Sequence, residues 1–513
     1  MVSQRSVAGL IRWSLQAAKR EFVGGSEKKV PNARFIILDP NGEYRKAFED
    51  MTDQCRVFRP GDDINPFILP AWMWNSYEWG AVTYAQPGSQ RPHLVRALRN
   101  LRAGKTAWEP LHVTIVRQLR LYRSKLHVFL ADGTGASYSG FPAVKNCADT
   151  IRHLADVIKE YEQRISDTSQ KAALQKIITA AEALFAKRVT PNTKTPGKFN
   201  YTDFNALDFE PFMPLFSAAE GTFPPVADDA QISEDAPIPF DINQLADHID
   251  DLCADSASST NLIAFLTLRI RSMLADLRMR QVIAPEEPLE FHKWLESFIG
   301  ANEAENGQIA IIDLSLVPSD VTHIVVAVLA RLVFESLQRY HNHHEDGKPL
   351  PTVLVLEEAH TFVRHVGNNE SWSESSANLC CEAFERVARE GRKFGLGLVL
   401  SSQRPSELSS TVLAQCNTFL LHRIVNDADQ KLISHLVPDN LGGLLRELPS
   451  LPSRHAILLG WATPIPILAE IDELPKQHRP QSADPDFWEV WTGADARPVD
   501  WSKITKDWVG EIS

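Results

Sequence analysis

The chain has 513 residues, 44% of them hydrophobic and 23% charged, which is the composition of a globular protein too long for one ordinary core. Its 65 acidic residues outnumber its 53 basic ones. The resulting net charge of -12 excludes a surface that binds nucleic acid all over, although it allows a local basic channel. Six cysteines without a CxxC pair are typical of a reduced, cytoplasmic protein.

The first part of the chain is predicted to be mostly helical. Apolar residues at helical spacing predict a helix over residues 5–21. A short apolar run then predicts a strand over 35–38, which ends at Asp39 and a Pro-Asn-Gly turn. Further on, we expect helices over 92–123, over 148–189 as one helix or a hairpin, and over 241–300, with loop and short elements over 190–240.

Strands and helices alternate over residues 307–424. This alternation predicts a parallel sheet with helices on both faces, and the strand at 35–38 is expected to join it. The most apolar long run, 324–334, is short and contains Arg331, so we expect no membrane span. The predicted strands are 307–315, 352–356, 396–403, 416–424 and a terminal pair at 455–461 and 464–471, and the predicted helices are 321–341 and 377–393.

These elements predict an α/β fold interrupted by a large, mostly helical insertion. The sheet core is expected to be formed by residues 1–90 and 301–475, and the insertion by 91–300. Residues 476–513 are polar and contain tryptophan, so we expect a surface tail.

Polar side chains gather where the predicted strands end. The buried strand 352–356 runs directly into two carboxylates, Glu357 and Glu358. Ligands of open α/β sheets bind at this end of the strands. Phosphoryl-transfer enzymes need one acid near Mg²⁺ and a second acid that orients or deprotonates the attacking water. Other polar residues expected at this edge are Asp39, Glu43, Ser401, Ser402 and Gln403.

The paired glutamates also have simpler explanations. Acids after a buried strand can mark the start of a helix, where they interact favourably with the helix dipole. The amide of Gln403, one helix and one strand later, favours a phosphate-sensing site instead. A metal-dependent hydrolase that uses Glu357 and Glu358 without ATP is a third alternative.

Basic residues suggest two further features. Arg392 and Arg423 are the best candidates for an arginine finger that neutralises charge on the phosphates. Between residues 91 and 125, nine basic residues meet a single acid, Glu109. This basic region either faces DNA or forms a solvated or subunit-pairing surface.

Several motifs resemble those of the HerA-type DNA translocases of the HerA/FtsK superfamily. They are IILDPNGEYRKAF near the start, VLVLEEAHTFV at 353–363, and FERVAREGRKFGLGLVLSSQRPSELSSTVLAQCNTFLLHRIVNDAD from residue 384. The resemblance implies a RecA-like ATPase that forms a homo-hexameric ring, moves double-stranded DNA and works with a nuclease or another effector. Many bacterial members act in antiphage defence.

The resemblance also implies roles for individual residues. Glu357 corresponds to the acid on the Mg²⁺ side, Glu358 to the catalytic acid and Gln403 to the sensor. Arg392 and Arg423 are finger candidates, and Asp39, Glu43 and Ser402 are expected around bound ATP.

One departure from the family concerns the phosphate loop, GxxxxGK[ST]. Gly104-Lys105-Thr106 is the only Gly-Lys-Ser/Thr, but Arg99 stands where the loop needs its first glycine. In the family, the loop and an amino-terminal β-barrel precede the helix that resembles residues 5–21. We therefore expect either that the loop is encoded upstream, or that this chain is a nucleotide-incompetent structural subunit.

Overall fold

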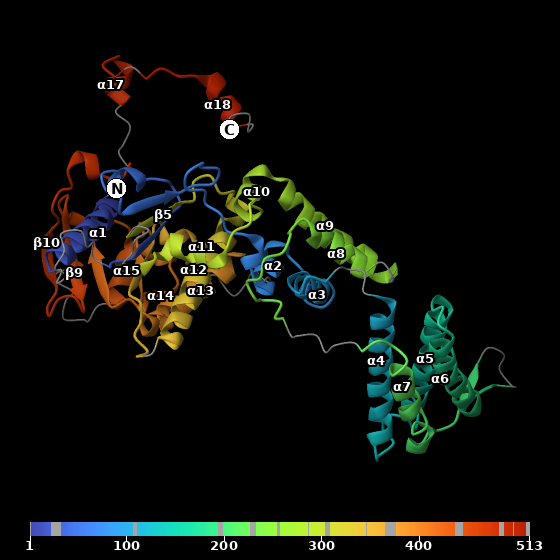
Figure 1. Cartoon of the computed structure of the whole chain (residues 1–513). Coiled ribbons are helices and arrows are strands. Elements are labelled where there is room, and N and C mark those ends of the chain that lie inside the picture. Colours follow the sequence, from blue (N-terminus) through green and yellow to red (C-terminus); the bar gives the residue numbers. More distant parts are fainter. Residues whose placement is uncertain are drawn as a thin grey trace. The chain divides into compact units, whose positions relative to one another are not determined.

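The protein is described by a computed structural model that divides into two compact units, shown in Figure 1. One unit contains Met1–Leu98 and Glu234–Ser513, and the other contains Arg99–Ser233. The described residues are 2–21, 32–105, 110–192, 198–225, 232–253, 257–285, 287–302, 308–344, 346–364, 376–436, 445–481, 487–495 and 497–508.

A parallel sheet of five strands lies at the centre of the first unit, in the order β2-β5-β1-β6-β7. Strand β1 lies between β5 and β6, where Leu38 is opposite both Ile312 and Leu356. The prediction that the strand at 35–38 joins the later strands is therefore confirmed. The strands are β1 Phe35–Asp39, β2 Cys55–Phe58, β5 Ile309–Asp313, β6 Thr352–Leu356 and β7 Leu396–Leu400.

Both faces of this sheet are covered, as expected for continuous apolar strands. Helix α1, Val2–Arg20, packs Ile11 and Leu15 into a core with Ile37, Ile311 and Val355. Residues with the opposite orientation, such as Leu38 and Leu356, are also fully buried. The predicted α/β fold, a RecA-like parallel sheet flanked by helices, is confirmed.

Helix α12, Ser319–His343, packs against α13, Ser376–Glu390, and against α2, Ser76–Val82. Its residues Val321–His343 have the length and composition of a membrane span, but 72% of the most apolar window is buried inside the protein. The core helix of a soluble protein has the same properties.

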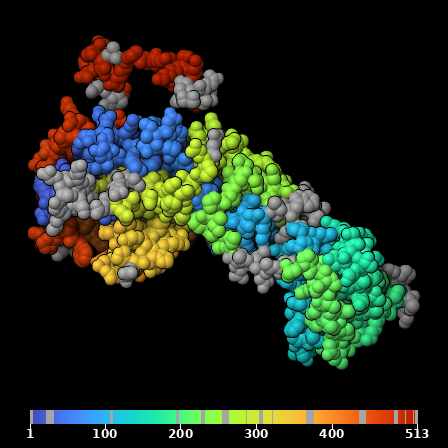
Figure 2. All heavy atoms as spheres, viewed as in Figure 1, coloured from blue at the N-terminus to red at the C-terminus, as the bar shows by residue number. Residues whose placement is uncertain are grey.

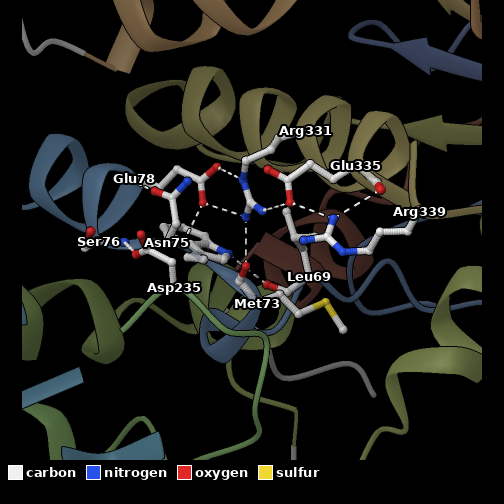
Figure 3. Close-up of polar contacts among 10 residues, drawn as sticks. Leu69, Met73, Asn75, Ser76, Glu78, Asp235, Arg331, Glu335 and Arg339 are labelled. Carbon is white, nitrogen blue, oxygen red and sulfur yellow. Dashed lines mark hydrogen bonds and ion pairs between the residues drawn. The ribbon is translucent and has the colours of Figure 1, made fainter. Parts of the chain in front are cut away.

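A buried ion pair between Arg331 of α12 and Glu78 of α2 joins the two helices (Figure 3). The Arg331 guanidinium donates to Glu78 through Nε at 2.5 Å and Nη2 at 2.9 Å, and Nη2 also donates to the Met73 carbonyl at 2.8 Å. Glu78 in turn accepts from the backbone N–H of Asn75, whose side chain caps α2. Ser76 donates its backbone N–H to Asp235 at 2.7 Å. These two charges can be buried because nearly every polar atom of both side chains forms a hydrogen bond or an ion pair.

The strand predicted at 416–424 forms β8, Thr418–Leu421, but it is not part of the parallel sheet. It pairs antiparallel with β9, His455–Gly460, which pairs antiparallel with β10, Ile467–Glu470. Extending the strand–helix alternation to residue 424 was therefore wrong. Its edge position beside β9 explains why three of its four residues stay exposed or partly exposed. The terminal pair β9–β10 is confirmed.

The first unit contains further helices around these sheets. The carboxyl-terminal segment, red in Figure 2, exposes Trp488, Trp491, Trp501 and Trp508. The helices are α3 Arg91–Arg102, α8 Gln244–Cys253, α9 Ala257–Ala275, α10 Leu277–Ile283, α11 Phe291–Ile299, α14 Ser410–Leu413, α15 Asp427–Leu436, α17 Phe487–Trp491 and α18 Trp501–Trp508. Residues 99–102 of α3 belong to the second unit.

The second unit is a helical bundle with its own core. Helices α5, Ala143–Arg164, and α6, Thr168–Arg188, form a hairpin, which was one of the two alternatives predicted for residues 148–189. They pack with α4, Leu111–Ala131, and α7, Phe212–Glu220, around a core that includes Leu119, Ile151 and Phe216. A short hairpin is formed by β3 Val189–Pro191 and β4 Phe199–Tyr201. The second unit contains fewer residues than the insertion predicted at 91–300, because helices α8–α11 belong to the first unit.

Candidate active site

The carboxyl ends of the parallel strands bring polar residues to one edge of the sheet. Asp39 ends β1 opposite Asp313, which ends β5. Glu357 follows β6 and Ser401 follows β7, and Leu356 and Leu400 immediately before them are paired. The side chains that the sequence predicted at strand ends therefore meet, at the position where open α/β sheets bind ligands.

Glu357 is a buried carboxylate held by two hydroxyl groups. Its side chain is 2% exposed. Tyr44 Oη donates to Glu357 Oε2 at 2.7 Å, and Ser401 Oγ donates to Oε1 at 3.1 Å. Burial raises the pKa of Glu357 to about 7, and the two hydrogen bonds counteract that rise because they favour the charged form. The side chain is thus fixed in orientation and poised between its two protonation states.

Asp39 organises the loop after β1. Its Oδ2 accepts the backbone N–H of Tyr44 at 2.8 Å, and its Oδ1 accepts the backbone N–H of Gly42 at 3.0 Å and of Asn41 at 3.3 Å. Burial raises the pKa of Asp39 to about 6. Both oxygens are engaged by the protein, so any contribution of Asp39 to ATP binding would act through this loop. That contribution stays a prediction.

Glycine is required in this loop for two reasons. Gly42 has φ +70, a backbone conformation that other residues adopt at a cost. A Cβ at this position would lie 3.0 Å from Asp313 Oδ1. Asp313 Oδ2 lies 3.1 Å from Nε of Arg59, the residue after β2, and Asp313 Oδ1 accepts a hydrogen bond from the Ser315 hydroxyl.

Glu358 points towards the end of the neighbouring strand. Its backbone is left-handed, with φ 47 and ψ 45, which is a strained conformation for a residue with a side chain. Gln403 Nε2 donates to Glu358 Oε1 at 2.7 Å. His360 Nδ1 lies 3.3 Å from Glu358 Oε2. The predicted catalytic acid and sensor are therefore in direct contact.

Ser402 and Glu43 also lie beside this pair. Ser402 Oγ is 3.3 Å from His360 Nδ1 and accepts the backbone N–H of Arg404 at 3.1 Å. The pKa of Glu43 is raised by partial burial and, to a lesser extent, by the negative charge of Glu358. Ser402 therefore contacts the cluster through His360, and Glu43 is close enough to Glu358 to influence it.

The two arginine candidates lie elsewhere. Arg392 is in the turn Gly391–Phe394, before β7 begins, and its guanidinium lies over the Trp461 ring at 5.1 Å. The length of β7, about 16 Å at 3.3 Å per residue, separates it from Gln403. Arg423 is exposed in the segment after β8. Among the described residues, no hydrogen bond or ion pair joins either arginine to Glu357 or Glu358.

The basic region at 91–125 is partly occupied by internal contacts. Arg91 stacks over the Tyr77 ring at 4.6 Å. In α4, Arg123 pairs with Glu220 at 3.1 Å, and Arg120 lies 3.8 Å from the same carboxylate. Lys105 follows α3 instead of a strand, which fits its rejection as a phosphate-loop lysine.

The oxygen atoms at this edge suit a hard cation such as Mg²⁺. In the part of the chain that the structure describes, no group of three or more His, Cys, Asp or Glu residues could hold a metal ion. Mg²⁺ in phosphoryl-transfer sites is usually held by one or two carboxylates together with substrate phosphates. Glu357 could supply one such carboxylate, since each of its oxygens keeps a lone pair that is not used by Tyr44 or Ser401.

Sequence reasoning missed Tyr44 and His360 as site residues. Tyr44 comes from a loop and His360 from the turn Ala359–Thr361, and neither position has a periodic pattern. One signal for Tyr44 was its position in the Asp-Pro-Asn-Gly-Glu-Tyr run, since a tight turn returns the chain towards the strand end.

The chain is similar to HerA-type DNA helicases. It is 30% identical over 208 residues to the DNA double-strand break repair helicase HerA of Sulfolobus acidocaldarius, covering 40% of this chain and 39% of that protein. It is 35% identical over 186 residues to the probable helicase MJECL08 of Methanocaldococcus jannaschii, covering 34% of each. The matches thus span between a third and two-fifths of these relatives.

Other comparisons are less informative. No model of a known protein family matches the chain. Among solved structures, VirB4 of Thermoanaerobacter pseudethanolicus aligns with 92% of this chain and 88% of its own, at 12% identity and a TM-score of 0.40. A TM-score this low adds nothing to the fold, which follows from the strand order and register.

Proposed function

We propose that this chain is an ATP-driven double-stranded DNA translocase or helicase subunit of the HerA type. The observation that carries the proposal is the hydrogen bond between Gln403 and Glu358, formed beside buried Glu357 at the carboxyl edge of a parallel sheet. An acid and an amide in contact at this edge match the requirement for positioning a lytic water. The similarity to HerA helicases supports DNA as the second ligand.

In this proposal the two glutamates have different roles. Glu358, which is partly exposed, orients the attacking water and accepts its proton. Gln403 holds the Glu358 carboxylate and senses the γ-phosphate through the same amide. Glu357 holds Mg²⁺ on the other side, where the bound ion supplies positive charge that neutralises the phosphates. The loop of Asp39 and Glu43 and the hydroxyl of Ser402 line the ATP side of the site.

The proposal also includes assembly of several copies of the chain into a ring. Because neither Arg392 nor Arg423 forms a hydrogen bond or ion pair with the glutamates of its own chain, we propose that one of them reaches the site of a neighbouring subunit in a homo-hexameric ring. A nuclease or other effector works with the ring, in DNA end processing or antiphage defence. The six free cysteines fit a reduced, cytoplasmic setting.

The test is ATP hydrolysis by the purified chain with Mg²⁺ and linear double-stranded DNA. We expect DNA-stimulated phosphate release that Glu358→Gln lowers by at least about 100-fold, since a positioned acid or base contributes that much. Glu382→Gln, an exposed acid on α13, is the matched control and should have no effect. A folded chain that hydrolyses no ATP would instead support the structural subunit. Hydrolysis that needs metal but no ATP would support the metal-dependent hydrolase.

A further inference from the structure

Tyr44 is a buried phenol with a single, specific polar partner. Its side chain is fully buried, and its hydroxyl donates to Glu357 Oε2 at 2.7 Å. This separation is ordinary for an O–H···O hydrogen bond and lies at the upper limit of the range for a hydroxyl group that donates to an ionised carboxylate. The two residues are 313 positions apart in sequence, so the contact depends entirely on the fold.

The loop before Tyr44 is built to hold that hydroxyl in place. Asp39 accepts the Tyr44 backbone N–H at 2.8 Å, which fixes the backbone at the point where the side chain leaves it. Gly42 allows the tight turn and packs against Asp313. The ring itself belongs to the core that includes Phe48 and Ile37. Neither the backbone nor the ring of Tyr44 can move without disturbing buried contacts.

The Glu357 carboxylate would be less constrained without this phenol. Ser401 Oγ holds only Oε1, over a longer distance of 3.1 Å. Loss of the Tyr44 hydroxyl would leave Oε2 without its protein donor and allow the carboxylate to rotate. Residues that orient a metal-binding carboxylate typically change metal affinity by about 10- to 100-fold when they are removed.

We propose that Tyr44 is a positioning residue that orients the Glu357 carboxylate towards a divalent cation in the nucleotide site. This inference rests on the proposed function, because it takes Glu357 as the residue on the Mg²⁺ side. It assigns a role to the loop after β1, where Asp39 acts through Tyr44 and not only on the nucleotide.

The test measures binding of Mn²⁺ to the full chain in the presence of ATP, by electron paramagnetic resonance. We expect Tyr44→Phe, which removes one oxygen atom, to weaken Mn²⁺ binding by about 10-fold or more. In DNA-stimulated hydrolysis, the Mg²⁺ concentration for half-maximal rate should rise by a similar factor, while kcat at saturating Mg²⁺ stays within about twofold. A purely structural role would not separate these two parameters.

Tyr138→Phe is the matched control. The Tyr138 hydroxyl donates to the Asp132 carbonyl at 2.7 Å, and its side chain is buried in the core of the helical bundle, which is the other compact unit. It loses a comparable hydrogen bond and should bind Mn²⁺ like the parent. Thermal unfolding of all variants confirms that each is folded.

The outcomes separate the inference from the function on which it rests. Mn²⁺ binding that Glu357→Gln abolishes but Tyr44→Phe leaves unchanged overturns the role of Tyr44 alone. Binding that survives Glu357→Gln overturns the assignment of Glu357 and the inference with it. A parent chain that binds no Mn²⁺ with ATP contradicts the proposed function itself, before any variant is compared.

Discussion

Gln403 Nε2 donates a hydrogen bond of 2.7 Å to Glu358 Oε1, joining the ends of two adjacent strands, β6 and β7. Because Gln403 is exposed, its contribution to folding should be small, whereas its contribution to the site should be large. We predict that Gln403→Ala lowers DNA-stimulated ATP hydrolysis by about 100-fold. Phosphate-release assays and thermal unfolding measure the two effects. A variant with full activity would remove Gln403 from the site.

The left-handed backbone of Glu358 predicts an unusual order of stability among its variants. Glycine adopts φ 47 without strain, whereas alanine keeps the strain and loses the same side-chain contacts. We predict that Glu358→Gly is more stable to urea than Glu358→Ala by about 1 kcal/mol. Both should be inactive in ATP hydrolysis. Equal stability of the two variants would contradict the strained conformation.

The ion pair between Arg331 and Glu78 should contribute strongly to folding. Their side chains are 14% and 2% exposed, so removal of one partner leaves a buried charge. We predict that Glu78→Gln lowers the free energy of unfolding by about 3–5 kcal/mol. The control is Arg339→Met, since Arg339 forms an exposed pair with Glu335 and should cost less than about 1 kcal/mol. Urea denaturation measures the free energy of unfolding of both variants. A loss for Glu78→Gln as small as that for Arg339→Met would show that the pair of Arg331 and Glu78 does not stabilise the fold.

The raised pKa of Glu357 predicts a pH dependence of stability in the chain without ligands. Its folded-state pKa of about 7 lies above the ordinary glutamate pKa of 4.5, so the folded state holds the proton more tightly than the unfolded state. The stabilisation from that proton is fully present below pH 4.5 and is lost as the pH rises towards about 7. It amounts to about 3 kcal/mol at most.

Unfolding of the parent and of Glu357→Gln between about pH 5 and about pH 8 measures this effect. The amide cannot titrate, so the variant should lose less stability over this range than the parent does. Asp39, with a pKa of about 6, should leave part of the dependence in both proteins. Identical pH profiles for parent and variant would show that Glu357 does not change its proton affinity on folding.

The parts of the fold that were predicted share a local signal. Strands β1, β6 and β7 are continuous apolar runs that end in polar residues, which also placed Glu358 and Gln403 at one edge. Strand β2 was missed because Arg56 interrupts a run of only four residues. Helix α7 was missed because Pro211 and Pro214 in a phenylalanine-rich segment favoured a loop.

Pairing partners were harder to predict than the elements themselves. Nothing local to the sequence of β8 distinguishes an antiparallel partner from a place in the parallel sheet. The contact of Tyr44 with Glu357 depends on a turn that three backbone hydrogen bonds to Asp39 define. Such contacts arise from the packed fold, where no single segment carries the information.

The central claim is that the Glu358–Gln403 pair belongs to an ATPase site that drives movement along DNA. The most direct measurement is displacement of a triplex-forming strand from linear double-stranded DNA by the purified chain. We predict displacement that requires ATP and Mg²⁺, is lost in Glu358→Gln and is retained in Glu382→Gln. Displacement by Glu358→Gln at the parent rate, or none by a parent chain that hydrolyses ATP, would contradict the account.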